Sequence, residues 1–108
     1  MMIIDEKRNC LRPYLGLDID VKGVVASIRS FYKKDKNQAT LLTITDVKSR
    51  RSSSINIHHL NFIIYNNDFQ QKYNSIKLGD VIEVKGKVIQ YPYRDSFGVK
   101  YRDMRVVC

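Results

Sequence analysis

The stretch from Leu78 to Tyr91 constrains the fold of this chain more than any other part of the sequence. Branched apolar residues occupy one parity at Ile82, Val84 and Val88, and charged residues occupy the other. This period is that of a β-strand with one buried and one solvent-exposed face. Gly86 interrupts the apolar parity, and a glycine there marks a position where a strongly bent strand gives up a side chain. The curvature predicts a small closed barrel.

A second strand of the same kind is predicted over residues 18–32. Its apolar positions change parity once, and they are Ile19, Val21, then after Gly23, Val24, Ala26 and Ile28. A one-residue change of parity at a glycine is typical of a β-bulge. A long strand bent at its centre can pair with one partner at its start and with another at its end.

An N-terminal extension, residues 1–16, is expected to pack on the barrel. It contains a short helix over residues 3–12, which ends there because Pro13 disfavours helical geometry at the residue before it. The side chains expected beneath the barrel are those of Cys10, Leu11, Tyr14 and Leu15.

Alternating apolar and polar residues, rich in threonine and branched side chains, predict the remaining strands. The predicted strands lie near residues 18–32, 39–47, 55–65, 80–91 and 99–107. In the second of them, Leu42 and Ile44 are expected to face inward. Between the third and fourth strands, Phe69, Tyr73 and Ile76 recur at helical spacing and predict a helix near residues 68–76.

The expected order is three strands, a short helix and two strands. Few small folds share this order, and the leading one is the five-stranded Greek-key OB-fold barrel. We therefore expect an all-β protein with one short helix in the barrel, in which residues 1–108 form a single domain. A chain of 108 residues can bury one modest core.

The net charge of +8 is concentrated in two blocks of the sequence. Residues 22–51 carry eight basic and two acidic side chains, and residues 81–108 carry six and three. Clustered positive charge in a protein with a pI near 9.6 is typical of proteins that bind nucleic acid. A solvated basic surface without a polyanionic partner is the alternative.

Aromatic residues alternate with cations in two places, a pattern that suits single-stranded nucleic acid because bases stack on rings while lysine and arginine contact phosphates. The first cluster comprises Arg29, Phe31, Tyr32, Lys33 and Lys34, with Arg50 and Arg51 on a hairpin expected to be adjacent. The second cluster comprises Tyr91, Tyr93, Arg94, Phe97, Lys100, Tyr101 and Arg102. In the expected topology the loops that carry them lie on one side of the barrel. Packing at a barrel end is the alternative for each ring.

No catalytic site, metal site or cofactor is predicted. A bulge is expected near His58 and His59, but adjacent residues of a strand point to opposite faces and rarely reach one ion. The carboxylates that a nuclease would need are scattered, at Asp46, Glu83, Asp95 and Asp103. The two cysteines, Cys10 and Cys108, lack metal-ligand spacing and are expected to stay reduced.

A cytoplasmic protein without a membrane partner is expected. No apolar run approaches the roughly 18 residues of a membrane span. The N-terminal residues are too acidic, and their apolar run too short, for a signal peptide.

Several motifs together resemble small OB-fold proteins carried by phages, plasmids and other mobile genetic elements. The motifs are Leu11-Arg-Pro-Tyr-Leu-Gly16, Val21-Lys-Gly-Val-Val25, Leu41 to Val47, His59-Leu60-Asn61-Phe62 and Gly79 to Tyr91. The resemblance covers most of the chain from residue 11 onward. It implies binding of single-stranded DNA or RNA, and single-stranded DNA with little sequence preference is the predicted ligand. The long acidic tail of cellular single-strand-binding proteins is missing, so a role as a replication-restart hub is not expected.

The competing hypothesis is a protein-binding module of a mobile element that inhibits or recruits a host factor, such as a replication or defence protein. A basic surface with exposed aromatic residues also makes hot spots for protein partners. Salt-sensitive binding of oligonucleotides by the isolated protein distinguishes the two hypotheses, and the sequence leaves the oligomeric state open.

Overall fold

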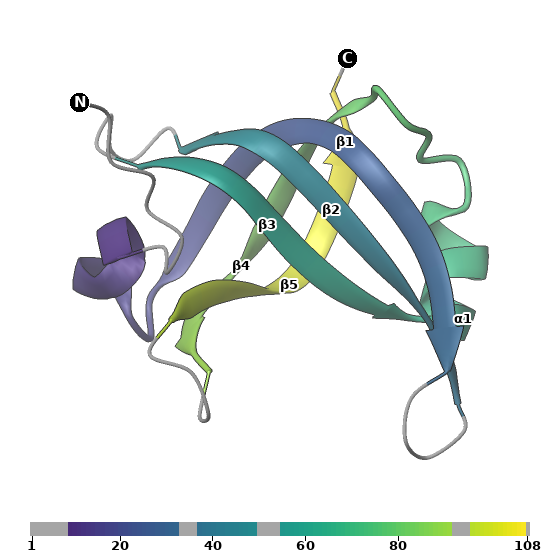
Figure 1. Ribbon diagram of the computed structural model, residues 1–108, viewed down its shortest axis with the longest axis horizontal. Helices are drawn as coiled ribbons and strands as arrows, with labels where there is room; N and C mark the ends of the chain where they lie inside the picture. Colours follow the sequence, from purple (N-terminus) through teal and green to yellow (C-terminus); the bar gives the residue numbers. More distant parts are fainter. Residues whose placement is uncertain (1–8, 33–36, 50–54, 92–95, 108) are drawn as a thin grey trace.

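A computed structural model describes residues 9–32, 37–49, 55–91 and 96–107 (Figure 1). The strands are β1 (Asp18–Tyr32), β2 (Gln38–Ser49), β3 (Asn56–Tyr65), β4 (Val81–Gln90) and β5 (Phe97–Val106). The helical segments are the 3₁₀ helix η1 (Asn9–Tyr14), the short α1 (Asn66–Asp68) and the π-helical η2 (Phe69–Tyr73). The strands form one antiparallel sheet in the order β3-β2-β1-β4-β5. The predicted class and order of elements are confirmed.

The sheet is not closed into a barrel, which corrects the expected closure. β3 and β5 are its two edges, and no ladder between described residues joins them. The edges approach each other through side chains instead, because the rings of Phe62 on β3 and Tyr101 on β5 meet edge to face with centroids 6.5 Å apart. Ring packing therefore replaces backbone hydrogen bonds at this seam between β3 and β5. The Greek-key description stays a prediction.

β1 belongs to both halves of the sheet. It pairs with β4 from Asp18 to Val24 and with β2 from Val21 to Tyr32. Figure 1 shows β1 as an arch that spans the molecule. The prediction that this strand has different partners at its start and at its end is confirmed.

In β1, the parity of the residues that face the core changes later than the sequence predicts. Buried positions continue from Val21 through Gly23 to Val25, and the register against β2 then shifts at the exposed Ala26. A Cβ atom at Gly23 would lie 2.8 Å from the Thr45 carbonyl oxygen. The glycine therefore permits a close approach of β2, and the bulge that changes the side lies three residues further on.

A second irregularity changes which side chains of β2 and of β3 face the core. β2 gains one residue relative to β1 at Asp46, whose φ is 55°. β3 follows β2 without a register shift, so the buried side of β3 also changes, from Leu60 to Ile57. The change of parity predicted near His58 and His59 is present, but the bulge that causes it lies between β1 and β2.

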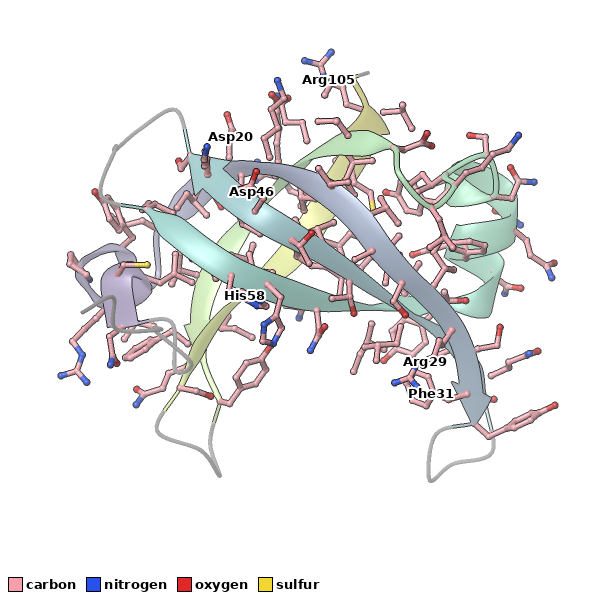
Figure 2. All side chains as sticks on the ribbon, turned by 45° about the horizontal axis from the view of Figure 1, so that its top comes forward. Asp20, Arg29, Phe31, Asp46, His58 and Arg105 are labelled. Carbon is pink, nitrogen blue, oxygen red and sulfur yellow. The ribbon has the colours of Figure 1, made fainter. Side chains whose placement is uncertain are left out.

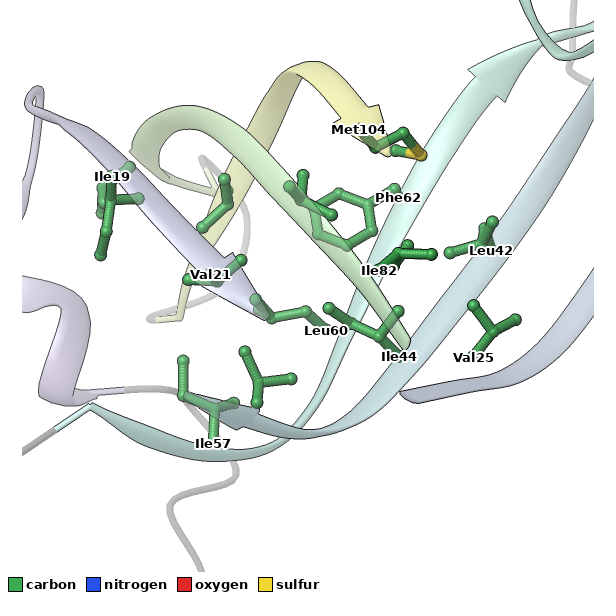
Figure 3. Packing of buried hydrophobic residues seen from close by; sticks show 14 of the residues in the cluster. Ile19, Val21, Val25, Leu42, Ile44, Ile57, Leu60, Phe62, Ile82 and Met104 are labelled. Atoms are coloured by element: carbon green, nitrogen blue, oxygen red, sulfur yellow. The ribbon is translucent and has the colours of Figure 1, made fainter. Parts of the chain in front are cut away.

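The hydrophobic core fills the inner side of the curved sheet (Figure 3). Leu42 and Ile44, predicted to face inward, are fully buried. Phe62 and Met104 pack against them from β3 and β5. Each buried side chain of this size contributes about 1.5–3 kcal/mol relative to exposure, so the core is the main source of stability.

The N-terminal segment supports the core differently from the expectation. The 3₁₀ helix η1 continues through Pro13 to Tyr14, so the predicted end of the helix before Pro13 is wrong. Leu11 is fully buried, and Cys10 and Tyr14 pack partly against the core. Leu15 is 47% exposed, contrary to the prediction, because the chain turns directly after η1. The earlier part of the predicted helix lies outside the described residues.

Glu83 on β4 is buried, although its parity predicts exposure. Its cross-strand neighbours are Lys22 on β1 and Arg105 on β5. The Arg105 Nε atom donates to the Glu83 Oε1 atom at 3.2 Å. This ion pair provides a partner for the carboxylate that the sheet covers.

The helical segment α1–η2 lies where a helix was predicted and packs against β5. Tyr73 and Ile76 are buried as the helical spacing implies. The Tyr73 hydroxyl donates to Asp103 Oδ1, and the Tyr101 hydroxyl donates to Asp68 Oδ2, each at 3.4 Å. Burial, followed by the negative charge of Asp68, raises the pKa of the Tyr101 hydroxyl to about 12. Burial also raises the pKa of Tyr73, with Asp103 as the second cause.

Gly86 lies at a close approach of β4 and β5. The register shifts at this glycine, which pairs with Tyr101, and Arg102 is the extra residue of β5. A Cβ atom at Gly86 would collide with the Lys100 carbonyl oxygen and lie 2.9 Å from the Tyr101 Cα atom. The glycine predicted to allow curvature is therefore required, because the backbone of β5 occupies the space of a side chain.

We expect Gly86→Ala to lower the free energy of unfolding by about 1–3 kcal/mol, the usual cost of overpacking. Ser30→Thr also adds a methyl group to a strand, but at an exposed position, and should change stability by about 0.5 kcal/mol or less. Urea unfolding followed by circular dichroism measures both. Equal stability of the two variants would show that the approach of β5 at Gly86 is not tight.

We expect stability to fall as the pH rises from about 10 to 12. The folded pKa of Tyr101 is about 12 and the unfolded value is about 10, so the stabilisation is complete below pH 10 and is lost as the hydroxyl titrates in the folded state. Tyr101→Phe should flatten this part of the stability curve and remove phenolate absorbance that appears near pH 12. A wild-type curve that is flat to pH 12 would contradict the burial of this hydroxyl.

Candidate nucleic-acid interface

The outer side of β1, β2 and β3 presents side chains that point away from the core. Cross-strand pairing arranges them in three rows: Ser27–Thr43–Asn61, Arg29–Leu41–Ile63 and Phe31–Ala39–Tyr65. We call these residues the outer platform. No member of the outer platform carries a carboxylate, so this part of the surface does not repel phosphate.

One end of the outer platform is aromatic. Tyr65 on β3 is 53% exposed, and Phe31 on β1 is half-buried. Ala39 lies between them on β2 and is fully buried, yet it does not belong to the hydrophobic core cluster. Because Ala39 is covered, a base can contact this end of the platform only through the rings of Phe31 and Tyr65 on the two flanking strands.

The middle of the outer platform combines cationic, aliphatic and polar groups. Arg29 is exposed and lies close to Phe31 near the C-terminal end of β1 (Figure 2). In the same row, Ile63 is 50% exposed. At the end of the platform opposite the aromatic row, the Thr43 hydroxyl donates to Asn61 Oδ1 at 2.7 Å, which orders the polar row.

The first predicted cluster is only partly assembled in the described structure. Arg29 and Phe31 belong to the outer platform, whereas Tyr32 is 75% exposed and has the opposite parity. β2 begins opposite Tyr32 and ends at Ser49, opposite Val21. The full length of β2 therefore lies between Tyr32 and the point after which the predicted hairpin begins. The predicted contacts outside the described residues are Lys33, Lys34, Arg50 and Arg51.

The second predicted cluster divides into buried rings and exposed cations. Phe97 is 2% exposed, and the Arg12 guanidinium covers its ring at 5.3 Å from the centroid. Tyr101 points inward against Phe62, and Tyr91 is half-buried against Gly98. Phe97 and Tyr91 pack at the end of the sheet, which was the alternative interpretation for each ring, whereas Tyr101 packs at the seam between β3 and β5. Tyr93 and Arg94 lie outside the described residues.

Lys100 and Arg102 are exposed on the outer side of β5. They flank Tyr101, whose ring meets Phe62 across the seam between β3 and β5. On β3, Phe62 lies between Asn61 and Ile63, which belong to the outer platform. Lys100 and Arg102 therefore lie across the seam from these two residues. The structure therefore places two cations of the second cluster across the seam from the part of the outer platform that lies on β3.

Sequence analysis missed the contribution of β3 to this surface. Ile63 and Tyr65 have the outward parity of that strand and are half exposed. Large apolar side chains at outward positions were the available signal, because such positions are usually polar in a sheet with one solvated face.

The two histidines correct another expectation. The rings of His58 and His59 lie edge to face with centroids 5.4 Å apart, and their Nδ1 atoms are 3.2 Å apart. The irregularity at the facing residue Asp46 brings the two side chains together instead of directing them to opposite faces. Among the side chains that the structure describes, no three potential ligands lie close enough to hold a metal ion.

The described part of the chain contains no helix with the length and hydropathy needed to cross a membrane. Its helical segments are all short.

Comparisons with known proteins show similarity at the level of structure. No protein-family model matches the sequence, and no curated protein matches it significantly. The mitochondrial single-stranded DNA-binding protein Rim1 of S. cerevisiae superposes with a TM-score of 0.63 at 11% identity, covering 85% of this chain and 94% of that chain. A lipoprotein from Klebsiella pneumoniae, for which nucleic-acid binding is an inference, superposes with a TM-score of 0.62 at 17% identity, covering 95% and 80%.

The single-stranded DNA-binding protein of Thermus aquaticus superposes with a TM-score of 0.56 at 13% identity. The match covers 86% of this chain and 51% of the Thermus chain. At such identities the similarity shows a shared fold. The chain thus has the fold of single-stranded DNA-binding proteins, which supports the OB-fold expected from its order of elements.

Proposed function

We propose that this protein binds single-stranded nucleic acid, with DNA as the first ligand to test, and that it does so with little sequence preference. The observation that carries the proposal is the outer platform, where Phe31 and Tyr65 flank a small alanine beside Arg29 and no carboxylate is present. The shared fold with single-stranded DNA-binding proteins supports this assignment.

Stacking and charge perform different parts of this binding. A base that stacks on an aromatic ring contributes about 1–3 kcal/mol, and every base offers a suitable face. Arginine and lysine neutralise phosphates and release counterions regardless of sequence. A duplex hides the faces of its bases, so the rings favour single strands over duplex.

Further contacts are proposed for cations and rings outside the described residues. They are Lys33, Lys34, Arg50, Arg51, Tyr93 and Arg94. On the described surface Lys100 and Arg102 are the proposed phosphate contacts of β5, and Tyr32 is an exposed ring next to Phe31. Phe97 is buried beneath Arg12 and Tyr101 packs against Phe62, so these two rings are proposed to act through packing and not through stacking on bases.

A protein partner is the second candidate. The half-exposed Ile63 on the outer platform favours it, because aliphatic side chains on a surface contribute more to protein contacts than to phosphate contacts. The partner would be a replication or defence protein of the host. Under this alternative, oligonucleotides do not bind the isolated protein.

The first test compares labelled oligo-dT, oligo-U and a duplex by fluorescence anisotropy across a salt series. We expect single strands to bind more tightly than duplex. Each phosphate contact contributes a slope of about −0.7 to log K against log salt, so a site of about five phosphates gives a slope of about −3 to −4. Absence of binding to all three ligands at low salt would refute the proposal and favour the protein partner.

The second test separates stacking from charge. Phe31→Ala should weaken binding of single strands about 5- to 150-fold, the equivalent of one lost stacking contact, with an unchanged salt slope. Arg29→Gln should instead reduce the slope by about 0.7. Leu78→Ala truncates an exposed apolar side chain before β4 and should change neither quantity. If Phe31→Ala binds as the wild type does, the outer platform does not carry the bases.

A further inference from the structure

Two lysines face each other directly on the outer side of β4 and β5. Lys87 pairs with Lys100 in the antiparallel ladder, and both side chains are exposed. Like charges directly opposite each other destabilise a sheet. The ion pairs between described side chains, Arg102–Asp18 and Arg105–Glu83, use other residues. Neither lysine forms an ion pair with a described side chain, so their mutual repulsion is a cost to folding.

The bulge in β5 adds a third cation to this pair. Arg102 is the extra residue of the bulge, and its Nη1 atom lies 3.4 Å from Asp18 Oδ2. Asp18 is also the cross-strand neighbour of Lys87 on β1. We call Lys87, Lys100 and Arg102 the β4–β5 cation cluster, and Asp18 is a carboxylate within its reach.

The position of this cluster relates it to the outer platform. Lys100 and Arg102 lie across the β3–β5 seam from the platform, because the inward rings of Phe62 and Tyr101 meet there. Lys87 lies one strand further, and adjacent paired strands are about 4.8 Å apart. A nucleic-acid strand that leaves the platform over β3 meets Lys100 and Arg102 first and Lys87 next.

We infer that the β4–β5 cation cluster is a phosphate-binding subsite for the backbone of the single strand, and that Asp18 competes with the phosphate for Arg102. This inference rests on the proposed function and extends the site onto β4. Lys87, which has no place in either aromatic cluster of the sequence, becomes a contact residue. Strands too short to leave the platform do not reach this subsite.

The competition follows from the strength of the two contacts. The Arg102–Asp18 pair is largely exposed, at 66% and 57% of the two side chains, and the loss of an exposed ion pair shifts an equilibrium by only about 1.4- to 5-fold. A phosphate offers arginine a bidentate, charge-assisted contact, and two lysines here add to its attraction. The strand therefore displaces Asp18, and the carboxylate lowers the affinity by a small amount.

The experiment measures anisotropy of labelled oligo-dT over a series of lengths and salt concentrations. Lys87→Gln combined with Lys100→Gln should reduce the salt slope by about 1.4 for long strands, because each lost phosphate contact removes about 0.7. The shortest strands that bind should keep the wild-type slope. Lys77→Gln removes an exposed lysine between η2 and β4 and serves as the control at every length.

Asp18→Asn provides a test with the opposite sign. It should tighten the binding of long strands about 1.4- to 5-fold, the range equivalent to a lost exposed ion pair, and Arg102→Gln should abolish this gain. Asp20→Asn removes the next exposed carboxylate on the same side of β1, which has no ion pair with a described side chain. It should have a smaller effect that does not depend on Arg102.

The outcomes separate this inference from the proposed function. If the wild type binds but the lysine variants keep its slope at every length, the subsite is wrong while single-strand binding stands. If Asp18→Asn and Asp20→Asn have equal effects, or if the gain persists without Arg102, the competition is wrong. If the wild type binds no oligonucleotide of any length, the proposed function fails and the subsite fails with it. Thermal melts of all variants confirm that these exposed substitutions preserve the fold.

Discussion

The curvature of this sheet depends on places where the backbone of one strand occupies the space of a neighbour's side chain. Gly86 accommodates the backbone of β5 at Lys100, and Gly23 accommodates the carbonyl oxygen of Thr45 on β2. Bulges at Ala26, Asp46 and Arg102 then redirect the strands. An untwisted sheet could not bring its two edge strands within reach of one another. Curvature therefore creates both the single core and the seam where Phe62 meets Tyr101.

The same curvature decides which outer surfaces become neighbours. β1 carries Arg29 and Phe31 toward one end and Asp18 toward the other, because it is shared between β2 and β4. The seam between β3 and β5 brings the carboxylate-free outer platform next to the cations of β5. Under the proposed function, the rings of the outer platform and the cations of β5 act on one strand of nucleic acid, although they come from different strands of the sheet. The role in binding proposed for the charged residues of β4 and β5 depends on this proximity.

Aromatic residues show most clearly how far sequence reasoning reaches for the candidate site. Phe31 and Phe97 both stand near cations in the sequence. Phe31 lies on the outer side after the bulge at Ala26, whereas Phe97 is buried beneath Arg12 of the N-terminal segment. Both rings have cations within three residues, and the distinction comes from a contact that is distant in sequence. The outward parity of Tyr65 could have been read from β3, but its proximity to Phe31 required the pairing of three strands.

The sequence by itself determined the strands, their order and most of their inward faces, because alternation with period two is a local property that burial on one side imposes. It also indicated Gly86 as the site of bending, and the helical spacing of Tyr73 and Ile76. Only the tertiary structure decided that the sheet stays open between β3 and β5, that Glu83 is buried against Arg105, and that His58 and His59 meet. Bulges change which residues face each other, and their exact position depends on the fit between backbones of adjacent strands. That fit depends on residues distant in sequence. Whether a residue faces the core or the solvent therefore cannot be predicted from the sequence of its own strand alone.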